Sequence, residues 1–336
     1  MCALDILLRT QDAQLDAIKS NLIRLAAVTE TVFRLAAADV TALATYVQLC
    51  LEDDPRLAIV DFGYSSFFGV SAVDGREPGS DVFGRPWNSV VYQHGVNSMV
   101  RRAFEGDFDT TLSYLQNKFV WYGTTKPFET LTQTFIATET GTFNAHHYRY
   151  APGISTFIVE CDRATWLRSG LHEAGEDESR VLCERVFRQA LDGHRLVSNR
   201  SLWRSFPWIW NGRWSYRNCV LIGDALRTAH YSIGSGTRLA LEDALALAKA
   251  LEAEPDDLPG GLRRFEADRR PIVEKLVTAS RRSAAWYDRF FEHMRLEPLD
   301  LAMSYITRSG RVDADRLRAA SPQFMQLYET RAGSAR

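Results

Sequence analysis

The 336-residue chain carries 40 lysines and arginines against 42 aspartates and glutamates, which gives a formal net charge of -2. This balance argues against a nucleic-acid-binding protein, because such proteins normally show a basic excess. Hydrophobic residues make up 46% of the chain and aromatic residues 11%, so we expect a globular protein with a sizeable core.

The cysteines and the apolar runs bear on the compartment. The five cysteines are scattered and form no CxxC pair. No apolar run reaches the roughly 18 to 20 residues of a membrane span. The start of the chain also lacks the basic patch and apolar core of a secretory signal. We therefore expect a cytoplasmic protein with reduced thiols and no membrane association.

The first third of the chain predicts few elements. Apolar periodicity indicates two helices within residues 12–51 and a short strand, LAIVDF, at 57–62. Residues 63–89 are rich in Gly, Ser, Asp and Pro, which is typical of a loop. The run WNSVVYQHG then predicts a buried strand that ends at Gly95, and VNSMVRRAF predicts a short helix after it.

The clearest sheet is predicted between residues 117 and 161. Turn signals KPF, TETG and APG separate four β-rich runs: NKFVWYGTT, ETLTQTFIATE, TFNAHHYRY and ISTFIVECD. Short turns between successive strands predict an antiparallel meander, with one buried face and one face free for a ligand or partner.

The remaining elements are mainly helical. We expect an amphipathic helix at about 178–191, a strand CVLIG, a helix at about 236–252 and a long helix beyond Pro259 that is bent or restarted near Pro271. The mixture of strands and helices predicts an α/β or α+β architecture.

The stretch NCVLIGDALRTAHYSIGSGTRLALEDALAL, which begins at residue 218, carries the strongest chemical signal. Gly223 allows a sharp turn that leaves Asp224 at the carboxyl end of a buried strand, where ligands bind in open α/β sheets. Gly234 and Gly236 leave bare backbone before an apolar helix, and such a helix start suits an anionic group. The alternative is a capped helix after a strand, since a glycine pair alone is a weak signal.

This stretch resembles the second FAD-binding motif of the single-component flavoprotein aromatic hydroxylases, which has a Gly-Asp-Ala-Ala-His turn, a glycine pair and Glu-Asp-Ala. TAHYSIGSGTRLALEDALAL resembles more narrowly the salicylyl-CoA 5-hydroxylase and 2-aminobenzoyl-CoA monooxygenase branch. Other segments resemble this branch in its order, over roughly residues 88 to 320: NKFVWYGTTKPF, GTFNAHHYRY, STFIVECD, LDGHRLVSNRSLWRSFP, FEADRRPIVEKL and ITRSGRVDADRLR.

The resemblance implies FAD as cofactor and NADPH or NADH as reductant. It implies hydroxylation of a small aromatic substrate, as a coenzyme A thioester, by a flavin C4a-hydroperoxide formed with O2, in aromatic compound catabolism. Asp224 would hold ribityl or ribose hydroxyls, and the catalytic candidates Thr228 and His230 would sit beside the flavin ring. The implied cofactor-binding residues are Gly223, Asp224, Ile233, Gly234, Ser235, Gly236, Thr237, Gly95 and Asn97. A homodimer is compatible with this family.

The resemblance also implies an α/β flavoprotein-hydroxylase fold, with an incomplete Rossmann-like FAD-binding domain and an interleaved mixed or antiparallel-sheet substrate domain. The expected parts are an atypical N-terminal region at 1–87, FAD-binding segments at 88–116 and 217–260, the substrate domain at 117–216 and C-terminal helices at 261–336.

The chain departs from the family pattern at three places. No GxGxxG stands near the start, although that turn normally seats the pyrophosphate of FAD. His94 replaces the acid of the family's Asp-Gly motif, and Arg227 stands at the usual histidine position after Gly-Asp. A truncated, non-catalytic or flavin-deficient homologue is therefore the alternative function.

Aromatic residues and histidines supply the substrate candidates. Trp203 and Phe206 belong to an aromatic-dense stretch that would form either a wall for the substrate ring or a hydrophobic core cluster. His146 and His147 occupy opposite-facing strand positions, so at most one points into a pocket, and His147 is our candidate. No third metal-type ligand stands at a helpful spacing, so we expect no metal site.

Three arginine pairs could meet the phosphates of coenzyme A: Arg101-Arg102, Arg269-Arg270 and Arg281-Arg282. Such pairs lie more often on solvated helix faces, and we expect this for at least two of the three.

Overall fold

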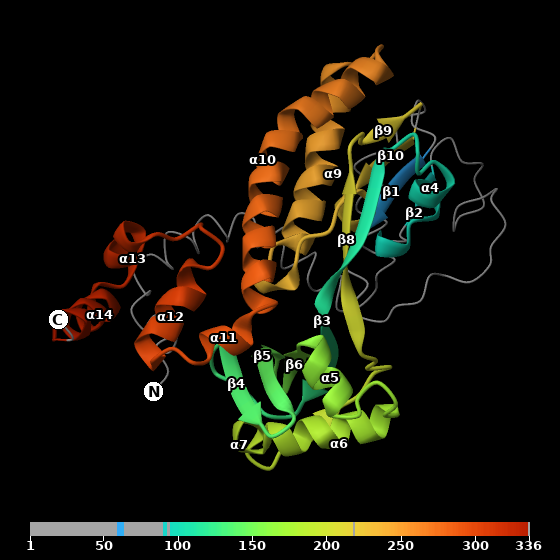
Figure 1. Cartoon of the computed structure of the whole chain (residues 1–336). Coiled ribbons are helices and arrows are strands. Elements are labelled where there is room, and N and C mark those ends of the chain that lie inside the picture. Colours follow the sequence, from blue (N-terminus) through green and yellow to red (C-terminus); the bar gives the residue numbers. More distant parts are fainter. Residues whose placement is uncertain (1–58, 64–89, 93–94, 218, 335–336) are drawn as a thin grey trace. The chain divides into compact units, whose positions relative to one another are not determined.

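The computed structural model describes residues 59–63, 90–92, 95–217 and 219–334 (Figure 1). Three predicted features lie outside the described residues: the helices within 12–51, the part of the 63–89 loop after Gly63, and His94. The chain forms two compact units. The described part of the first, the parallel-sheet unit, comprises residues 59–63, 90–92, 95–113, 207–217 and 219–281, and that of the second, the antiparallel-sheet unit, comprises 114–206 and 282–334.

The parallel-sheet unit contains a four-stranded sheet in the order β2-β1-β10-β9. The strands are β1 (Ile59–Gly63), β2 (Val90–Tyr92), β9 (Ser215–Tyr216) and β10 (Cys219–Ile222). β1 pairs in parallel with both β2 and β10, while β9 is antiparallel to β10. All four side chains of β10 are buried, as expected for a strand covered on both faces. The strands predicted at 57–62, 87–95 and 219–223 are thus confirmed as β1, β2 and β10, except that Gly95 begins η2 (Gly95–Asn97) and does not end the second strand.

Helices of the parallel-sheet unit follow the strand ends. They are η2 (Gly95–Asn97), α4 (Met99–Ala103), α8 (Gly223–Leu226), η3 (Tyr231–Ile233), α9 (Gly236–Ala253) and the first part of α10 (Leu258–Tyr287). The helix predicted at about 236–252 is confirmed as α9. α10 continues as one helix through Pro271 and is not restarted there. α9 and α10 run side by side, linked by Arg269 of α10, which binds Asp243 of α9 (Figure 1).

The antiparallel-sheet unit confirms the predicted strands but not their full order. Its sheet has the order β4-β5-β6-β3-β7, with β8 also paired to β3. The strands are β3 (Thr110–Thr124), β4 (Thr132–Thr138), β5 (Gly141–Ala151), β6 (Ile154–Cys161), β7 (Leu196–Val197) and β8 (Arg204–Asn211). The predicted meander holds for β4, β5 and β6, but β3 pairs with β6 instead of β4. The connection around Pro127 is too long for a tight hairpin and leads the chain across the sheet.

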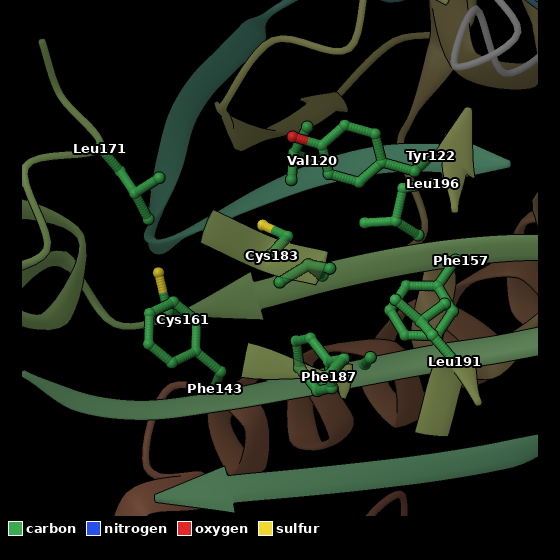
Figure 2. Packing of buried hydrophobic residues seen from close by; sticks show 12 residues of the cluster. Val120, Tyr122, Phe143, Phe157, Cys161, Leu171, Cys183, Phe187, Leu191 and Leu196 are labelled. Carbon is green, nitrogen blue, oxygen red and sulfur yellow. The ribbon is translucent and has the colours of Figure 1, made fainter. Parts of the chain in front are cut away.

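One face of this sheet packs against two helices. The helix predicted at 178–191 is divided into α6 (Glu176–Val186) and α7 (Arg188–Leu191), and α5 (Arg163–Arg168) precedes them. Figure 2 shows the shared core, in which Phe143 and Phe157 of the sheet approach Cys183 and Phe187. The complete cluster is Val120, Tyr122, Phe143, Ala145, Phe157, Val159, Cys161, Leu171, Cys183, Phe187, Leu191 and Leu196.

The opposite face of the sheet is covered too, so the prediction of a free face is wrong. Phe135 of β4 packs against Trp286, Tyr287 and Phe290, which belong to α10 and α11 (Phe290–His293). Every residue of β6 from Ser155 to Cys161 is buried. The local strand pattern could not reveal this cover, because the covering helices come from the distant C-terminal part of the chain.

The C-terminal segment adds α12 (Pro298–Thr307), α13 (Ala314–Ala320) and α14 (Pro322–Ser334). Leu317, Phe324 and Met325 form a small core with side chains of α12. None of the described helices combines the length and the apolar character that a membrane crossing needs. The two sheets and their helices confirm an α/β fold with a mixed sheet and an antiparallel sheet.

Candidate functional site

Three parallel strands end at one edge of the parallel-sheet unit. Phe62 of β1 pairs with Ile222 of β10, so the ends of both strands lie beside each other. The chain leaves β10 through α8, and α8 packs against β1, η2 and α9. The structure therefore brings Gly95 and Asn97 of η2 close to the helix that carries Gly223 and Asp224. In open α/β sheets this edge is where ligands bind.

Asp224 is a buried carboxylate without a hydrogen bond from any described residue. Gly223 places it there by adopting a φ of 60°, a left-handed conformation that glycine tolerates best. Burial raises the pKa of Asp224 to about 7, with Arg227 opposing the rise and Asp243 adding to it. Buried polar groups are nearly always hydrogen-bonded, so this carboxylate fits a ligand that supplies hydroxyl donors.

The turn at Gly223 is held by a buried ion-pair network. Arg227 donates from Nη2 to Asp243 Oδ2 at 2.7 Å and from Nη1 to the carbonyl of Gly223 at 2.7 Å. The amide of Gly223 donates to the same Asp243 oxygen at 3.1 Å. Arg269 binds the other oxygen of Asp243 at 2.9 Å and Glu242 at 2.6 Å. Both oxygens of Asp243 thus have partners within the protein, whereas Asp224 has no donor among the described residues.

Arg101 joins η2 to α8. Its guanidinium donates to the carbonyl of Ala225 at 2.9 Å and to that of Val96 at 2.5 Å. Arg101 and Arg269 are both buried, so the expectation that at least two arginine pairs lie wholly on solvated faces is wrong. Only Arg281 and Arg282 are both exposed. The partners of the buried arginines are distant in sequence, which is why pair spacing did not reveal them.

The bare backbone before α9 has room around it. Gly234 has a φ of 57° and ends η3, and the Ser235 hydroxyl turns back to the carbonyl of Ile233 at 3.1 Å. No described side chain caps α9, whose first residues are Gly236 and Thr237. A Cβ added at Gly234 or Gly236 would meet no described atom within 4 Å, so packing among the described residues requires neither glycine at those points. An uncapped helix start with open space suits a flat, electron-rich ligand.

Thr228 and His230 lie on the loop between α8 and η3. The Thr228 hydroxyl donates to the carbonyl of Pro207 at 2.8 Å and accepts from the amide of Ile209 at 2.9 Å, so it holds the loop to β8. The buried His230 donates its amide to Ser280 Oγ at 2.7 Å, and its Nδ1 lies 2.8 Å from Ser232 Oγ. These contacts fix the orientation of the imidazole ring, which also lies against the ring of Tyr231 with centroids 4.1 Å apart.

The three substrate candidates are packed within the antiparallel-sheet unit. Trp203 donates from Nε1 to Ser179 Oγ at 2.6 Å, and Phe206 is buried. His147 stacks on Phe157 with ring centroids 5.0 Å apart, and its Nε2 lies 2.9 Å from a threonine hydroxyl. Burial, followed by the charge of the neighbouring histidine, lowers the pKa of His147 to about 3. Their contact with a substrate stays a prediction.

Sequence reasoning did not single out Asn144 and Gln133, two buried amides on adjacent strands. Gln133 donates from Nε2 to Asn144 Oδ1 at 2.6 Å. Asn144 stands between the apolar Phe143 and Ala145 in the β5 run. The polar Asn144 within this apolar run was the sequence signal that could have identified it.

No known protein-family description matches the chain. Curated relatives do. Salicyloyl-CoA 5-hydroxylase from Streptomyces sp. is 38% identical over 230 residues, which cover 66% of this chain and 44% of that protein. The 3-hydroxy-4-methyl-anthranilyl-[aryl-carrier protein] 5-monooxygenase from Streptosporangium sibiricum is 44% identical over 225 residues, 66% of this chain and 59% of that protein. The protodeoxyviolaceinate monooxygenase of Chromobacterium violaceum is 36% identical over 223 residues, which cover 66% of this chain and 59% of that protein.

Solved structures give a weaker likeness. PqsL, described as a probable FAD-dependent monooxygenase from Pseudomonas aeruginosa, shares 22% identity at a TM-score of 0.48, over 67% of this chain and 61% of that one. A 2-methyl-3-hydroxypyridine-5-carboxylic acid oxygenase shares 14% identity at a TM-score of 0.45, over 67% and 57%. At these TM-scores the likeness adds nothing to the relationship between the sequences.

The relationship rests on matches of 36 to 44% identity to three monooxygenases. The matched region spans about half the length of these curated relatives, between 44% and 59%. Over about two thirds of its length, this chain is therefore a homologue of aromatic-ring monooxygenases of the salicyloyl-CoA 5-hydroxylase branch, the relationship that its motifs predicted.

Proposed function

We propose that this chain provides the flavin-binding and substrate-binding parts of a monooxygenase that hydroxylates an aromatic ring carried as a thioester, with FAD as cofactor and NADPH or NADH as reductant. The FAD-binding part would be residues 88–116 and 217–260, and the substrate part 117–216. Two relatives support the thioester, since one is named for a coenzyme A ester and another for an aryl-carrier protein.

The observation that carries the proposal is the buried Asp224 carboxylate at the common edge of three parallel strands. It lacks a donor among the described residues, and the guanidinium of Arg227 donates to Asp243 and to the Gly223 carbonyl. The hydroxyls of a ribityl chain or a ribose would supply the donors that a buried carboxylate requires. Gly95 and Asn97 lie on the neighbouring η2, within the same group of elements.

The chain's other residues would orient the flavin ring. The backbone of Ile233 to Thr237 offers room beside Gly234 and Gly236, and the start of α9 would stabilise negative charge on a bound ring. His230 would border the ring in the orientation that Ser280 and Ser232 impose. When bound, FAD would supply hydride acceptance and activation of O2, and the protein would orient the substrate and exclude water.

The substrate would be a small aromatic acyl compound. Trp203, Phe206 and His147 remain our proposed substrate residues, and their packing suggests that they would shape the pocket from within the fold. Thr228, proposed as catalytic from the resemblance, would act by holding the His230 loop to β8, because the backbone of Pro207 and Ile209 occupies its hydroxyl.

The test begins with flavin. The purified chain is titrated with FAD, and the visible absorption of the protein fraction is recorded, with Asp224→Ala as the comparison. We expect saturable binding by the natural chain and at least tenfold weaker binding by the variant. NADPH and NADH oxidation is then followed with salicyloyl-CoA and with 2-aminobenzoyl-CoA. A folded chain that binds no FAD would contradict the proposal and favour a flavin-deficient homologue.

A further inference from the structure

A chain of hydrogen bonds crosses the antiparallel-sheet unit and ends on Asn144. The Tyr287 hydroxyl lies 3.3 Å from that of Tyr305, which lies 3.5 Å from Gln133 Oε1. Gln133 then donates from Nε2 to Asn144 Oδ1 at 2.6 Å. The two tyrosines come from α10 and α12, while the amides belong to β4 and β5.

The direction of these hydrogen bonds determines which polar atom of the Asn144 side chain has no partner among the described residues. Gln133 Oε1 accepts from Tyr305, so Gln133 presents its Nε2 to Asn144, and Asn144 must accept with Oδ1. The Nδ2 group of Asn144 is consequently not used by these hydrogen bonds, and no described residue accepts from it. Asn144 is only 1% exposed, so bulk water does not satisfy this donor. A buried donor without an acceptor is costly, which indicates a missing partner.

Asn144 faces away from the aromatic core of α6 and α7. Its neighbours Phe143 and Ala145 belong to that core, and successive strand residues alternate between faces. His146 shares the face of Asn144, and its Nδ1 also lacks a partner among the described residues. Burial lowers the pKa of His146 to about 4, so the ring beside Asn144 is neutral. Glu160 stands opposite Asn144 on β6, and its Oε1 accepts from Asn117, so the missing partner meets a neutral imidazole and a carboxyl group that is already hydrogen-bonded.

We propose that Asn144 is a substrate-binding residue whose Nδ2 group donates a hydrogen bond to the carbonyl oxygen of an aryl thioester. A carbonyl oxygen only accepts, which matches a group that only donates. Helix α12, which carries Tyr305, covers this end of the hydrogen-bond chain, and none of its residues is fully buried. The inference rests on the proposed function, because that function supplies the thioester. It places the carbonyl on the sheet face opposite His147, so Asn144 would replace His147 as the substrate contact of this strand.

The experiment compares two ligands that differ at the carbonyl. Salicyloyl-CoA and S-(2-hydroxybenzyl)-CoA, in which a methylene replaces the carbonyl, are titrated calorimetrically into the full chain. We expect about tenfold tighter binding of the thioester, the equivalent of one good hydrogen bond. Asn144→Asp keeps the oxygen that accepts from Gln133 but loses the donor, so the preference for the thioester should disappear.

Arg149→Gln is the matched control. Arg149 lies on the same strand as Asn144 and is exposed, so this variant should keep the thioester preference. Equal binding of both ligands by the natural chain overturns the inference and leaves the donor to an ordered water. Binding of neither ligand overturns it as well, and so does a preference that survives in Asn144→Asp. If that variant does not fold, the ratio in the natural chain decides alone.

FAD binding is recorded on the same samples, which separates the two proposals. A chain that holds FAD but shows no thioester preference contradicts the role of Asn144 alone. A chain that shows the preference but binds no FAD contradicts the proposed function alone.

Discussion

Arg227 and Asp243 form a buried ion pair with a 2.7 Å contact between Nη2 and Oδ2, and their side chains are 2% and 0% exposed. The same Asp243 oxygen receives the amide of Gly223. One carboxylate thus secures the guanidinium and the backbone of the turn that presents Asp224. Arg227 consequently holds the backbone of this turn through the carbonyl of Gly223.

Removing this carboxylate should destabilise the parallel-sheet unit strongly. Asp243→Asn leaves the buried Arg227 without its ion-pair partner and leaves Arg269 with Glu242 alone. Breaking a buried pair in this way costs about 3 to 5 kcal/mol. Urea denaturation followed by circular dichroism measures the change. Glu242→Gln is the control, because Glu242 is partly exposed and its loss should cost about 1 kcal/mol or less. Similar midpoints for both variants would contradict the role of the network.

Asp224 should make stability fall as the pH rises. Burial raises its pKa from 3.8 to about 7, so between these values the folded chain keeps a proton that the unfolded chain has released. The unfolding free energy then decreases by at most about 1.4 kcal/mol per pH unit across this window and is constant above it. Asp224→Asn cannot titrate and should lose this dependence. The measurement is the urea midpoint at pH 5, 6, 7 and 8 without FAD, and parallel curves for the two proteins would refute the expectation.

Gly236 should be dispensable for folding and important for the affinity for FAD. A Cβ at this position meets nothing within 4 Å, and alanine favours helices by up to about 1 kcal/mol over glycine. Gly236→Ala should therefore be as stable as the natural chain or slightly more so. The added methyl group enters the space proposed for the flavin ring, so FAD affinity should drop about tenfold or more. Lys249→Ala, an exposed change near the other end of α9, should leave FAD affinity unchanged.

Substitutions of the neighbouring Arg101 and Arg102 should differ sharply in their effect on the unfolding free energy. Arg101→Gln removes the buried contacts to Ala225 and Val96, and losing hydrogen bonds from a charged donor costs about 1.5 to 3 kcal/mol. Arg102 is exposed and binds carbonyls of its own turn, so Arg102→Gln should change stability by less than about 1 kcal/mol. Thermal and urea unfolding of the pair test this contrast. Equal losses would show that Arg101 does not join η2 to α8.

Local patterns predicted many of the elements. The β-rich runs became β4, β5 and β6, because alternation and turn residues act over a few neighbours. The stretch from Cys219 to Ala253 became strand, turn and helix for the same reason, with Gly223 at the positive φ that the turn required. The motifs in this stretch also carried the relationship to aromatic-ring monooxygenases.

Contacts between distant residues were decided by the tertiary structure. β3 joined β6 because strand pairing depends on the path of a connection and not on strand order alone. The second face of the sheet was covered by helices more than a hundred residues away, which buried Asn144 and its neighbours. Arg101 and Arg269 found partners that pair spacing could not indicate.

The features of the candidate site can likewise be separated into those that the sequence determined and those that the tertiary structure decided. The sequence by itself determined that Asp224 follows a buried strand and that bare glycines precede α9, because both are properties of a short segment. Only the tertiary structure decided that Arg227 binds Asp243 and that Asp224 is buried without a donor among the described residues. The free energy of a buried charge depends on every group packed around it, and those groups are assembled only when the chain folds.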